Sequence, residues 1–457
     1  MQYETQFTEN DELLKQQEKD LKSENSNQSF KYFWVVTLLI ISFSAFIKIP
    51  TFNLSHKEGD EVAFWYLTKN WIDTQKYTLK GSILAKTPTY FERANREMPV
   101  HPPMFAFLLK PFVQHNSLKY SVLVSWLGHL MTILAVALIG RWLIQRLQLN
   151  DQVNGLSPLF WMPLLGVATD PIMTYISGIL WIDNLHAGFA ALSVAFSLIA
   201  TSSNKKLPFY FLSGVFLGFA LLSKVTSIMI VPVLLFIIFL FEKNKLWKPL
   251  LAGAIPALMM SLPWYIPLYQ TTGDVLMHQG AKPEAYQKAL EKMQPQQLKE
   301  FQKKTRCEFC EAGQATPWYY LWVKLPLINP LVFLTLFFYG LFFYKLKTTN
   351  EKLESKHWLI PLFWFLWVML VATIVHVYIH RRITILVASI YFMLFVLMVL
   401  SEKYKQLKLY QPHLLFSAML CIIYSAMTGV FYLFHAGYAE IYSLPELAGV
   451  VNLWGAQ

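Results

Sequence analysis

The feature that most constrains this chain is a series of long apolar runs that carry almost no charge. An α-helix needs about 20 apolar residues to cross a hydrocarbon core of about 30 Å. About eleven runs approach or reach this length. They lie at 31–50, 118–146, 156–175, 183–201, 207–222, 225–241, 249–269, 319–345, 357–378, 383–400 and 413–435. The sequence therefore predicts an all-α integral membrane protein.

The composition agrees with a lipid environment. Hydrophobic residues make up 55% of the 457 residues and charged residues only 15%, whereas a soluble globular chain has roughly 25% charged residues. The formal net charge is +11, but Lys and Arg are spread in small groups between the apolar runs. Because they form no single basic patch, we expect no nucleic-acid partner.

The distribution of charge predicts the topology. Under strict alternation, the basic loops fall on one side, which the positive-inside rule identifies as cytoplasmic. These loops are 141–150, 202–207, 242–248, 345–356 and 401–408. Two long connections, 51–117 and 270–318, then lie on the outer side and are expected to form an extracytoplasmic cap over the bundle of residues 31–435.

Smaller segments complete the predicted architecture. Residues 104–112 are apolar but too short to span, so they predict an interfacial or re-entrant helix after Pro102-Pro103. Residues 284–304 predict an amphipathic helix on the membrane surface. We expect residues 1–30 to be a disordered cytoplasmic tail and residues 436–457 an extracytoplasmic tail.

The ionisable residues that could carry chemistry gather at the outer ends of the predicted spans, which contain almost no charge at mid-depth. Asp60 and Glu61 open an aromatic helical stretch after the first span. Asp60 has two compatible interpretations: a helix N-cap, or a general base that removes a proton from an acceptor hydroxyl. Asp183 starts the fourth span and is either a cap or a catalytic acid.

The basic residues at the same end also leave two interpretations each. Lys224 lies in a hairpin between two spans. Arg381 and Arg382 are adjacent and come just before the span at 383–400. They either anchor in lipid headgroups or hold the phosphate of a lipid substrate. His101, which is restricted by the prolines that follow it, is either structural or functional.

Other motifs limit the chemistry. Cys307 and Cys310 predict a tight disulfide in an oxidising outer compartment, since a zinc site would need two further ligands. No Gly-rich phosphate loop, nucleotide fingerprint, zincin motif or nucleophile elbow is present. We therefore expect no enzyme acting on cytosolic nucleotides and no cofactor, and the need for a divalent metal stays open.

Seven short motifs occur in an order that resembles one family. They are Gly59-Asp-Glu61, His101-Pro-Pro-Met104, Trp181-Ile-Asp183, Leu222-Ser-Lys224, Leu262-Pro-Trp-Tyr265 followed by Gly273-Asp274, Thr316-Pro-Trp-Tyr-Tyr320 and His380-Arg-Arg382. Over residues 60–400 the chain resembles the polytopic GT-C glycosyltransferases related to lipid A aminoarabinose transferase and the protein O-mannosyltransferases.

The resemblance implies a function and roles for residues. Such enzymes take a sugar from a polyprenyl-phosphate donor and transfer it to an extracytoplasmic hydroxyl of a lipid, glycan or protein. Asp60 would then be the general base, with Glu61 and Asp183 as further catalytic candidates. Lys224, Arg381, Arg382 and His101 would hold the donor phosphate. We expect a bacterial inner membrane, with the active site facing the periplasm or exterior.

Two other functions are compatible with this sequence. A flippase or transporter for lipid-linked sugars would also have many spans and a polar cap, but it requires polar groups along a cavity between the helices. A relative without catalytic activity would serve as a partner in membrane assembly. The position of Asp60 relative to lipid separates this possibility from an enzyme.

Overall fold

The computed structural model describes residues 32–53, 59–81, 99, 101–150, 152–242, 246–272, 320–349, 356–374 and 384–435, and these residues contain helices and no strand. After a first helix at Tyr32–Phe52, whose last turn is η1 (Ile49–Asn53), the elements follow in chain order. They are α2 (Gly59–Thr74), α4 (Met104–Gln114), α5 (Leu118–Ser121), α6 (Leu123–Arg146), α7 (Pro158–Ala168), α8 (Pro171–Ser177), α9 (Asp183–Ser202), α10 (Lys206–Ser223), η3 (Val225–Ile230), α11 (Val231–Phe241), α12 (Trp247–Thr272), α15 (Tyr320–Ile328), α16 (Leu331–Thr348), α17 (Leu359–Ile374), α18 (Val387–Lys403), α19 (Lys405–Lys408) and α20 (Gln411–His435).

Within these ranges, eight helices are long and apolar enough to cross a membrane, and α7 with α8 forms a bent pair that gives a ninth. Two further predicted spans correspond to the shorter apolar helices Val225–Phe241 and Leu359–Ile374. The predicted span 319–345 corresponds to α15 and α16, of which only Leu331–Thr348 is long enough alone. The fold class predicted from the sequence, an all-α multi-pass membrane protein, is confirmed.

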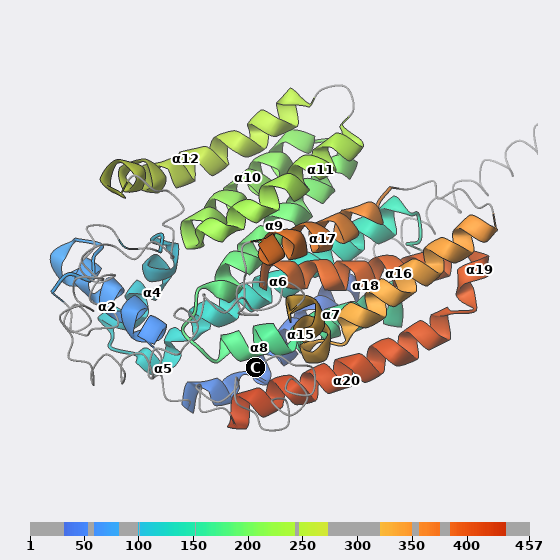
Figure 1. Cartoon of the computed structure of the whole chain (residues 1–457), viewed down its shortest axis with the longest axis horizontal. Helices are drawn as coiled ribbons and strands as arrows, with labels where there is room; N and C mark the ends of the chain where they lie inside the picture. Colours follow the sequence, from blue (N-terminus) through green and yellow to red (C-terminus); the bar gives the residue numbers. More distant parts are fainter. Residues whose placement is uncertain are drawn as a thin grey trace, which may run out of the picture.

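Burial separates the central helices from those that face lipid. Every residue in the apolar window of Thr384–Lys403 is buried, against 22% of the window in Trp247–Thr271. In Figure 1, α18 lies in the middle of the bundle, α12 along its upper edge and α20 along its lower edge. Large apolar side chains such as Met259, Phe333 and Phe416 are exposed. These side chains are suited to contact with lipid tails rather than water.

The third predicted span, 156–175, is broken in the structure. The α7 and α8 axes differ by 45°, and between them Asp170 accepts a hydrogen bond from the Met173 N–H (2.9 Å) as the N-cap of α8. The second carboxylate oxygen of Asp170 accepts hydrogen bonds from Asn329 Nδ2 (2.8 Å) and the Tyr391 hydroxyl (3.0 Å). Neighbouring helices thus supply the hydrogen bonds that a break inside a bundle requires.

The other side of this break is held from the first helix and α6. His129 Nε2 lies 2.7 Å from the Val167 carbonyl, and the Ser44 hydroxyl donates to the Ala168 carbonyl (3.1 Å). Lys48, fully buried, donates to the Ser44 carbonyl at 2.8 Å and contacts its hydroxyl at 2.5 Å. Neither Lys48 nor Asp170 was among the candidate residues predicted from the sequence.

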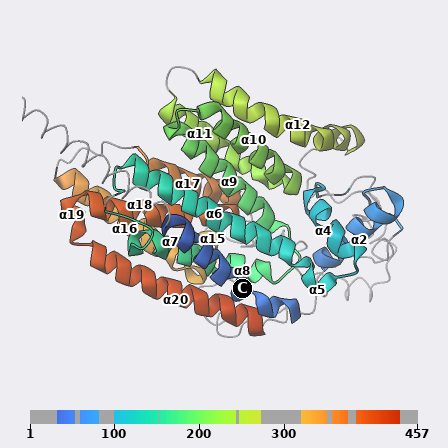
Figure 2. The same cartoon turned by 180° about the vertical axis from the view of Figure 1, so that it is seen from behind.

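One end of the bundle carries α2 and α4, which lie outside the long helices in both views (Figures 1 and 2), and α5, which leads into α6. The predicted short helix after Pro102-Pro103 is confirmed as α4. It packs on α2 through Phe64 and Phe105, whose ring centroids are 4.8 Å apart. The second cap loop from 273 onward, including 284–304, and both predicted tails lie outside the described residues.

Candidate functional site

The acidic pair lies in the first turn of α2, which begins at Gly59. For Asp60 the structure describes the backbone, which places the residue inside this turn. The next residue, Glu61, is buried at 1% exposure, and its Oε1 accepts a hydrogen bond from the Leu180 N–H at 2.7 Å. Because Leu180 lies between α8 and α9, Glu61 ties the start of α2 to the bundle.

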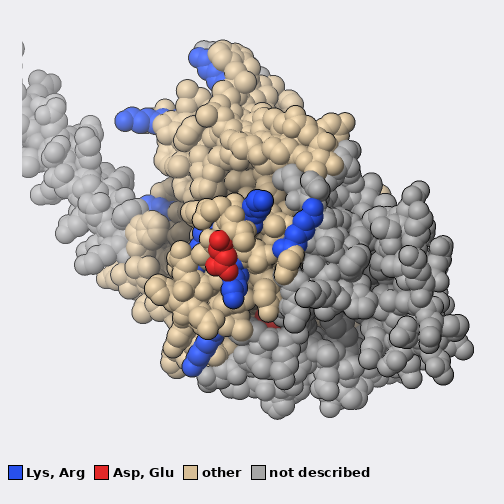
Figure 3. Space-filling view, turned by 90° about the vertical axis from the view of Figure 1, so that its left-hand side faces the viewer, with Lys and Arg blue, Asp and Glu red and all other residues tan. Residues whose placement is uncertain are grey.

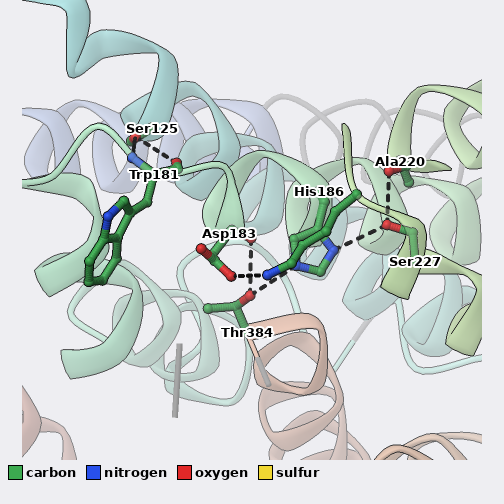
Figure 4. Close-up of polar contacts among 8 residues, drawn as sticks. Ser125, Trp181, Asp183, His186, Ala220, Ser227 and Thr384 are labelled. Carbon is green, nitrogen blue, oxygen red and sulfur yellow. Dashed lines mark hydrogen bonds and ion pairs between the residues drawn. The ribbon is translucent and has the colours of Figure 1, made fainter. Parts of the chain in front are cut away.

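The segment between α8 and α9 is also held from α6. Ser125 Oγ lies 2.7 Å from the Ile179 carbonyl and 2.9 Å from the Trp181 carbonyl, and it accepts a hydrogen bond from the Trp181 N–H at 3.2 Å. Figure 4 shows Ser125 against the Trp181 backbone. This arrangement fixes the start of α9, where the next candidate residue lies.

Asp183 and Lys224 form a direct ion pair. Lys224 Nζ lies 2.5 Å from Asp183 Oδ1, and the two side chains are only 14% and 5% exposed. Ile182, not Asp183, is the N-cap of α9. Lys224 therefore does not simply extend to a headgroup, and Asp183 is not simply a cap, since each side chain is directed at the other.

His186, one turn along α9 from Asp183, connects the segments around this pair (Figure 4). Its Nδ1 lies 3.2 Å from Ser227 Oγ, and its Nε2 lies 3.4 Å from Thr384 Oγ1. Thr384 Oγ1 also donates to the Asp183 carbonyl (3.0 Å), and Ser227 Oγ donates to the Ala220 carbonyl (2.9 Å). The network joins α9, the α10–η3 connection and the start of the central helix.

The tautomer of His186 follows from these partners. The Ser227 hydroxyl uses its hydrogen on the Ala220 carbonyl, so its oxygen accepts from Nδ1–H of His186. The Thr384 hydroxyl likewise uses its one hydrogen on the Asp183 carbonyl, so it has no hydrogen left to donate to Nε2, 3.4 Å away. A neutral His186 that carries its proton on Nδ1 thus makes the shorter of the two contacts, to Ser227, and adds no charge beside Lys224.

The ring of His101 lies beside α2. Its ring centroid is 5.1 Å from that of Phe64, one turn after Asp60 on α2. The Tyr77 hydroxyl lies 3.1 Å from the His101 carbonyl and 3.2 Å from the Pro102 carbonyl. Burial raises the pKa of Tyr77, so its hydroxyl stays a neutral donor to these carbonyls.

The cap side is also linked to α12. The Tyr77 and Trp264 ring centroids are 5.4 Å apart, and the Tyr265 hydroxyl donates to the Leu221 carbonyl at 2.8 Å. Two members of the predicted Leu262-Pro-Trp-Tyr265 motif therefore contact the cap and the end of α10 that carries Lys224.

Several predicted site residues cannot be placed in this network. Arg381, Arg382, Cys307 and Cys310 lie outside the described residues. Within the ranges that the structure does describe, no three His, Cys, Asp or Glu side chains group in a way that could hold a metal ion.

On the described surface at the end of the molecule that carries α2 and α4, most residues are uncharged, and the charged ones are more often basic than acidic. Figure 3 faces this end, and on its coloured part Lys and Arg side chains outnumber Asp and Glu. Lys69, Lys76 and Lys80, on α2 and just after it, are exposed, as is the acidic Asp73. A surface of this sign attracts anionic molecules.

Comparison with known proteins shows which proteins the chain resembles. The family described as "Dolichyl-phosphate-mannose-protein mannosyltransferase" matches residues 100–266. No curated protein sequence matches the chain.

Solved structures match over most of the chain. ArnT from Cupriavidus metallidurans in the apo state has a TM-score of 0.51 and 13% identity, covering 88% of this chain and 75% of that one. The same protein bound to undecaprenyl phosphate has a TM-score of 0.51 and 12% identity, with the same coverage. An oligosaccharyltransferase from Archaeoglobus fulgidus, in complex with Zn and sulfate, has a TM-score of 0.53 and 13% identity, covering 88% of this chain and 53% of that one.

These matches confirm the predicted resemblance to GT-C glycosyltransferases. The structural matches show the shared fold, and the family match lies on α4 to α12, the part that contains Asp183 and Lys224. The roles of the individual site residues stay predictions.

Proposed function

We propose that this GT-C-type glycosyltransferase moves a sugar from a polyprenyl-phosphate donor to a hydroxyl group on the outer side of a bacterial inner membrane. The acceptor is a lipid, a glycan or a protein. The ArnT structure bound to undecaprenyl phosphate supports the donor class. The basic loops at the end opposite the cap support the orientation, because Lys and Arg favour the cytoplasmic side.

The observation that carries this proposal is the meeting of acidic and basic groups at the capped end. Glu61, next to Asp60, reaches the segment before α9, and α9 then presents Asp183 to Lys224. Glu61 and Leu180, and Asp183 and Lys224, are thus joined by direct contacts around the start of α9. A single lipid headgroup there can be approached by a carboxylate from α2 and by an ammonium group from the end of α10.

The proposed reaction is a single displacement with inversion. The acceptor oxygen attacks the anomeric carbon of the donor sugar while Asp60 takes the hydroxyl proton. The bond from that carbon to the phosphate oxygen breaks, and its electron pair stays on the phosphate. Lys224, Arg381, Arg382 and His101 stabilise the negative charge of the leaving lipid phosphate.

These cationic groups can provide the stabilisation that a metal ion would otherwise give, so we propose that transfer needs no divalent metal. Transfer should therefore persist after the purified enzyme has been treated with a chelator. Complete loss of transfer on chelation, restored by adding a metal ion, would contradict this part of the mechanism.

The role of Asp60 is tested by replacing it with Asn. We expect Asp60→Asn to abolish sugar transfer in the purified enzyme while thermal unfolding stays unchanged, because the amide keeps the shape of the carboxylate but cannot take a proton. Asp73→Asn is the matched control, since Asp73 is exposed at the other end of the same helix.

The assay follows both transfer and lipid movement. Full turnover by Asp60→Asn would refute the general-base role. Movement of the lipid-linked sugar across the membrane without cleavage of its phosphate bond would instead favour the transporter function.

A further inference from the structure

The Asp183–Lys224 ion pair raises a question about the proposed phosphate site. A lysine that binds a phosphate must offer its ammonium group to that phosphate, but here the ammonium lies 2.5 Å from a carboxylate oxygen and both side chains are almost buried. Any anion that reaches Lys224 therefore meets a second negative group already in contact with it.

The main chains on both sides of the pair are fixed by contacts that do not involve the pair. Thr384 donates to the Asp183 carbonyl (3.0 Å). The Lys224 N–H donates to the Ala220 carbonyl (2.9 Å), and the Lys224 carbonyl accepts from the Ser227 N–H (3.0 Å). Separation of the two charges thus requires side-chain rotation and leaves α9 and α10 in place.

Burial explains why a carboxylate is needed when no ligand is present. A buried ammonium without an anionic partner is strongly destabilising. Asp183 provides that partner in the structure described here. A phosphate that approached Lys224 would provide the same charge, and the two anions would repel one another across the same ammonium group.

We propose that Asp183 is a positioning residue that holds Lys224 until the donor phosphate arrives and returns to Lys224 when the prenyl phosphate leaves. This inference rests on the proposed function, since it assigns Lys224 to the donor phosphate. The Asp183 carboxylate competes for Lys224 with the phosphate of the donor and with the phosphate of the product. Its return to Lys224 assists release of the prenyl phosphate after the sugar has been transferred.

The proposal predicts opposite effects on binding and on turnover. In Asp183→Asn the competing charge is gone, so undecaprenyl phosphate should bind at least about tenfold more tightly. The donor KM should fall for the same reason. The kcat should also fall, because the product is released more slowly. A residue with only a structural role would weaken binding or leave it unchanged.

The experiment measures the affinity of undecaprenyl phosphate for the full chain in nanodiscs of uncharged lipid, together with kcat and KM. Glu242→Gln is the matched control. Glu242 forms the Lys206–Glu242 pair (2.7 Å) at the other end of α10, and its loss should leave the affinity unchanged. An unchanged or weaker affinity in Asp183→Asn overturns the proposal.

Lys224→Met separates failure of this proposal from failure of the proposed function. If Lys224→Met binds undecaprenyl phosphate as tightly as the natural chain, Lys224 is not a phosphate ligand and the assigned donor site is wrong. If Lys224→Met binds weakly and Asp183→Asn does not bind more tightly, the donor site stands and only the competition is wrong.

Lys224→Arg keeps the proposal testable if Asp183→Asn does not fold. A guanidinium group has five N–H donors in a planar fork and can hold a carboxylate and a phosphate together. We expect Lys224→Arg to bind undecaprenyl phosphate more tightly than the natural chain, with a lower donor KM. An equal or weaker affinity in a folded Lys224→Arg protein refutes competition at this position.

Discussion

The close crossing of α6 and α9 leads to a prediction that links helix packing to the candidate site. At Gly128 of α6, a Cβ atom would lie 2.2 Å from the Asn184 carbonyl carbon, 2.3 Å from the Asn184 oxygen and 2.3 Å from the Leu185 nitrogen. Gly188 of α9 lies at the same crossing, where its own Cβ would be 2.3 Å from the Gly128 oxygen. Small residues allow helix backbones in membranes to approach in this way.

The distances set the expected size of the effect of Gly128→Ala. Ordinary van der Waals contact begins at 3.4 Å. The backbones of α6 and α9 must therefore move apart by about 1 Å to make room for the new methyl group. The obstructing atoms are all backbone, so no side chain can rotate away, and the start of α9 must move. Overpacking of this kind costs about 1–3 kcal/mol of unfolding free energy. Asp183 precedes Asn184, and a misplacement of about 1 Å can reduce turnover by about 100-fold.

The assay compares thermal unfolding and sugar transfer of Gly128→Ala with those of Gly340→Ala. Gly340 lies in α16, where an added Cβ would meet nothing within 4 Å. We expect Gly340→Ala to keep full activity and to gain up to about 1 kcal/mol, because alanine favours the helix. If Gly128→Ala has the same thermal stability and the same turnover as the natural chain, the close packing of α6 on α9 and its effect on the candidate site are refuted.

Two further predictions concern a buried cation and a buried histidine. Lys48 is fully buried, its described hydrogen bonds are to Ser44, and it lies near His129, so Lys48→Met should keep the unfolding free energy or raise it by about 1 kcal/mol; a loss in chemical denaturation would contradict this. At the other end of the bundle, burial and the nearby Arg146 and Lys403 lower the pKa of His357 to about 4 from 6.5. The folded state thus binds this proton more weakly than the unfolded state, so the stability that His357 contributes is complete above about pH 6.5 and falls as the pH drops towards 4. Between pH 7 and pH 5 the natural chain should lose about 2 kcal/mol through this group, and His357→Gln should lose less; equal losses in detergent-solubilised protein would refute the assignment.

The spans were predictable from the sequence because lipid imposes a length and a composition on any helix that crosses it. The breaks inside two spans were missed, although each has a local signal. Asp170-Pro171 and Asn329-Pro330 are dipeptides that favour turns, and the proline begins α8 in one case and caps α16 in the other. The breaks were not predicted because each lies within a continuous apolar run, and hydropathy does not show where the backbone changes direction.

The candidate site was predictable only in part. Alternation of the spans placed Asp60, Asp183 and Lys224 at the same end, because each follows or precedes a span on that side. The pairing of Asp183 with Lys224 was not predicted, since periodicity gives no information on contacts 41 positions apart. His186 was missed, although it lies three positions after Asp183 and such residues share a helix face.

With the proposed orientation, the ion pair also explains why a lysine is tolerated on the side of the membrane that the positive-inside rule disfavours. A lysine that only anchored the α10–η3 hairpin to lipid headgroups would extend into solvent and need no buried carboxylate. Lys224 instead lies at 14% exposure against Asp183, in a region that Glu61, Ser125 and Thr384 hold in place through backbone contacts. Burying both charges costs free energy, and the attraction between them offsets this cost when the surrounding contacts hold the two side chains together. The arrangement therefore suits a lysine that waits for an incoming anion better than a lysine that anchors a hairpin at the membrane surface.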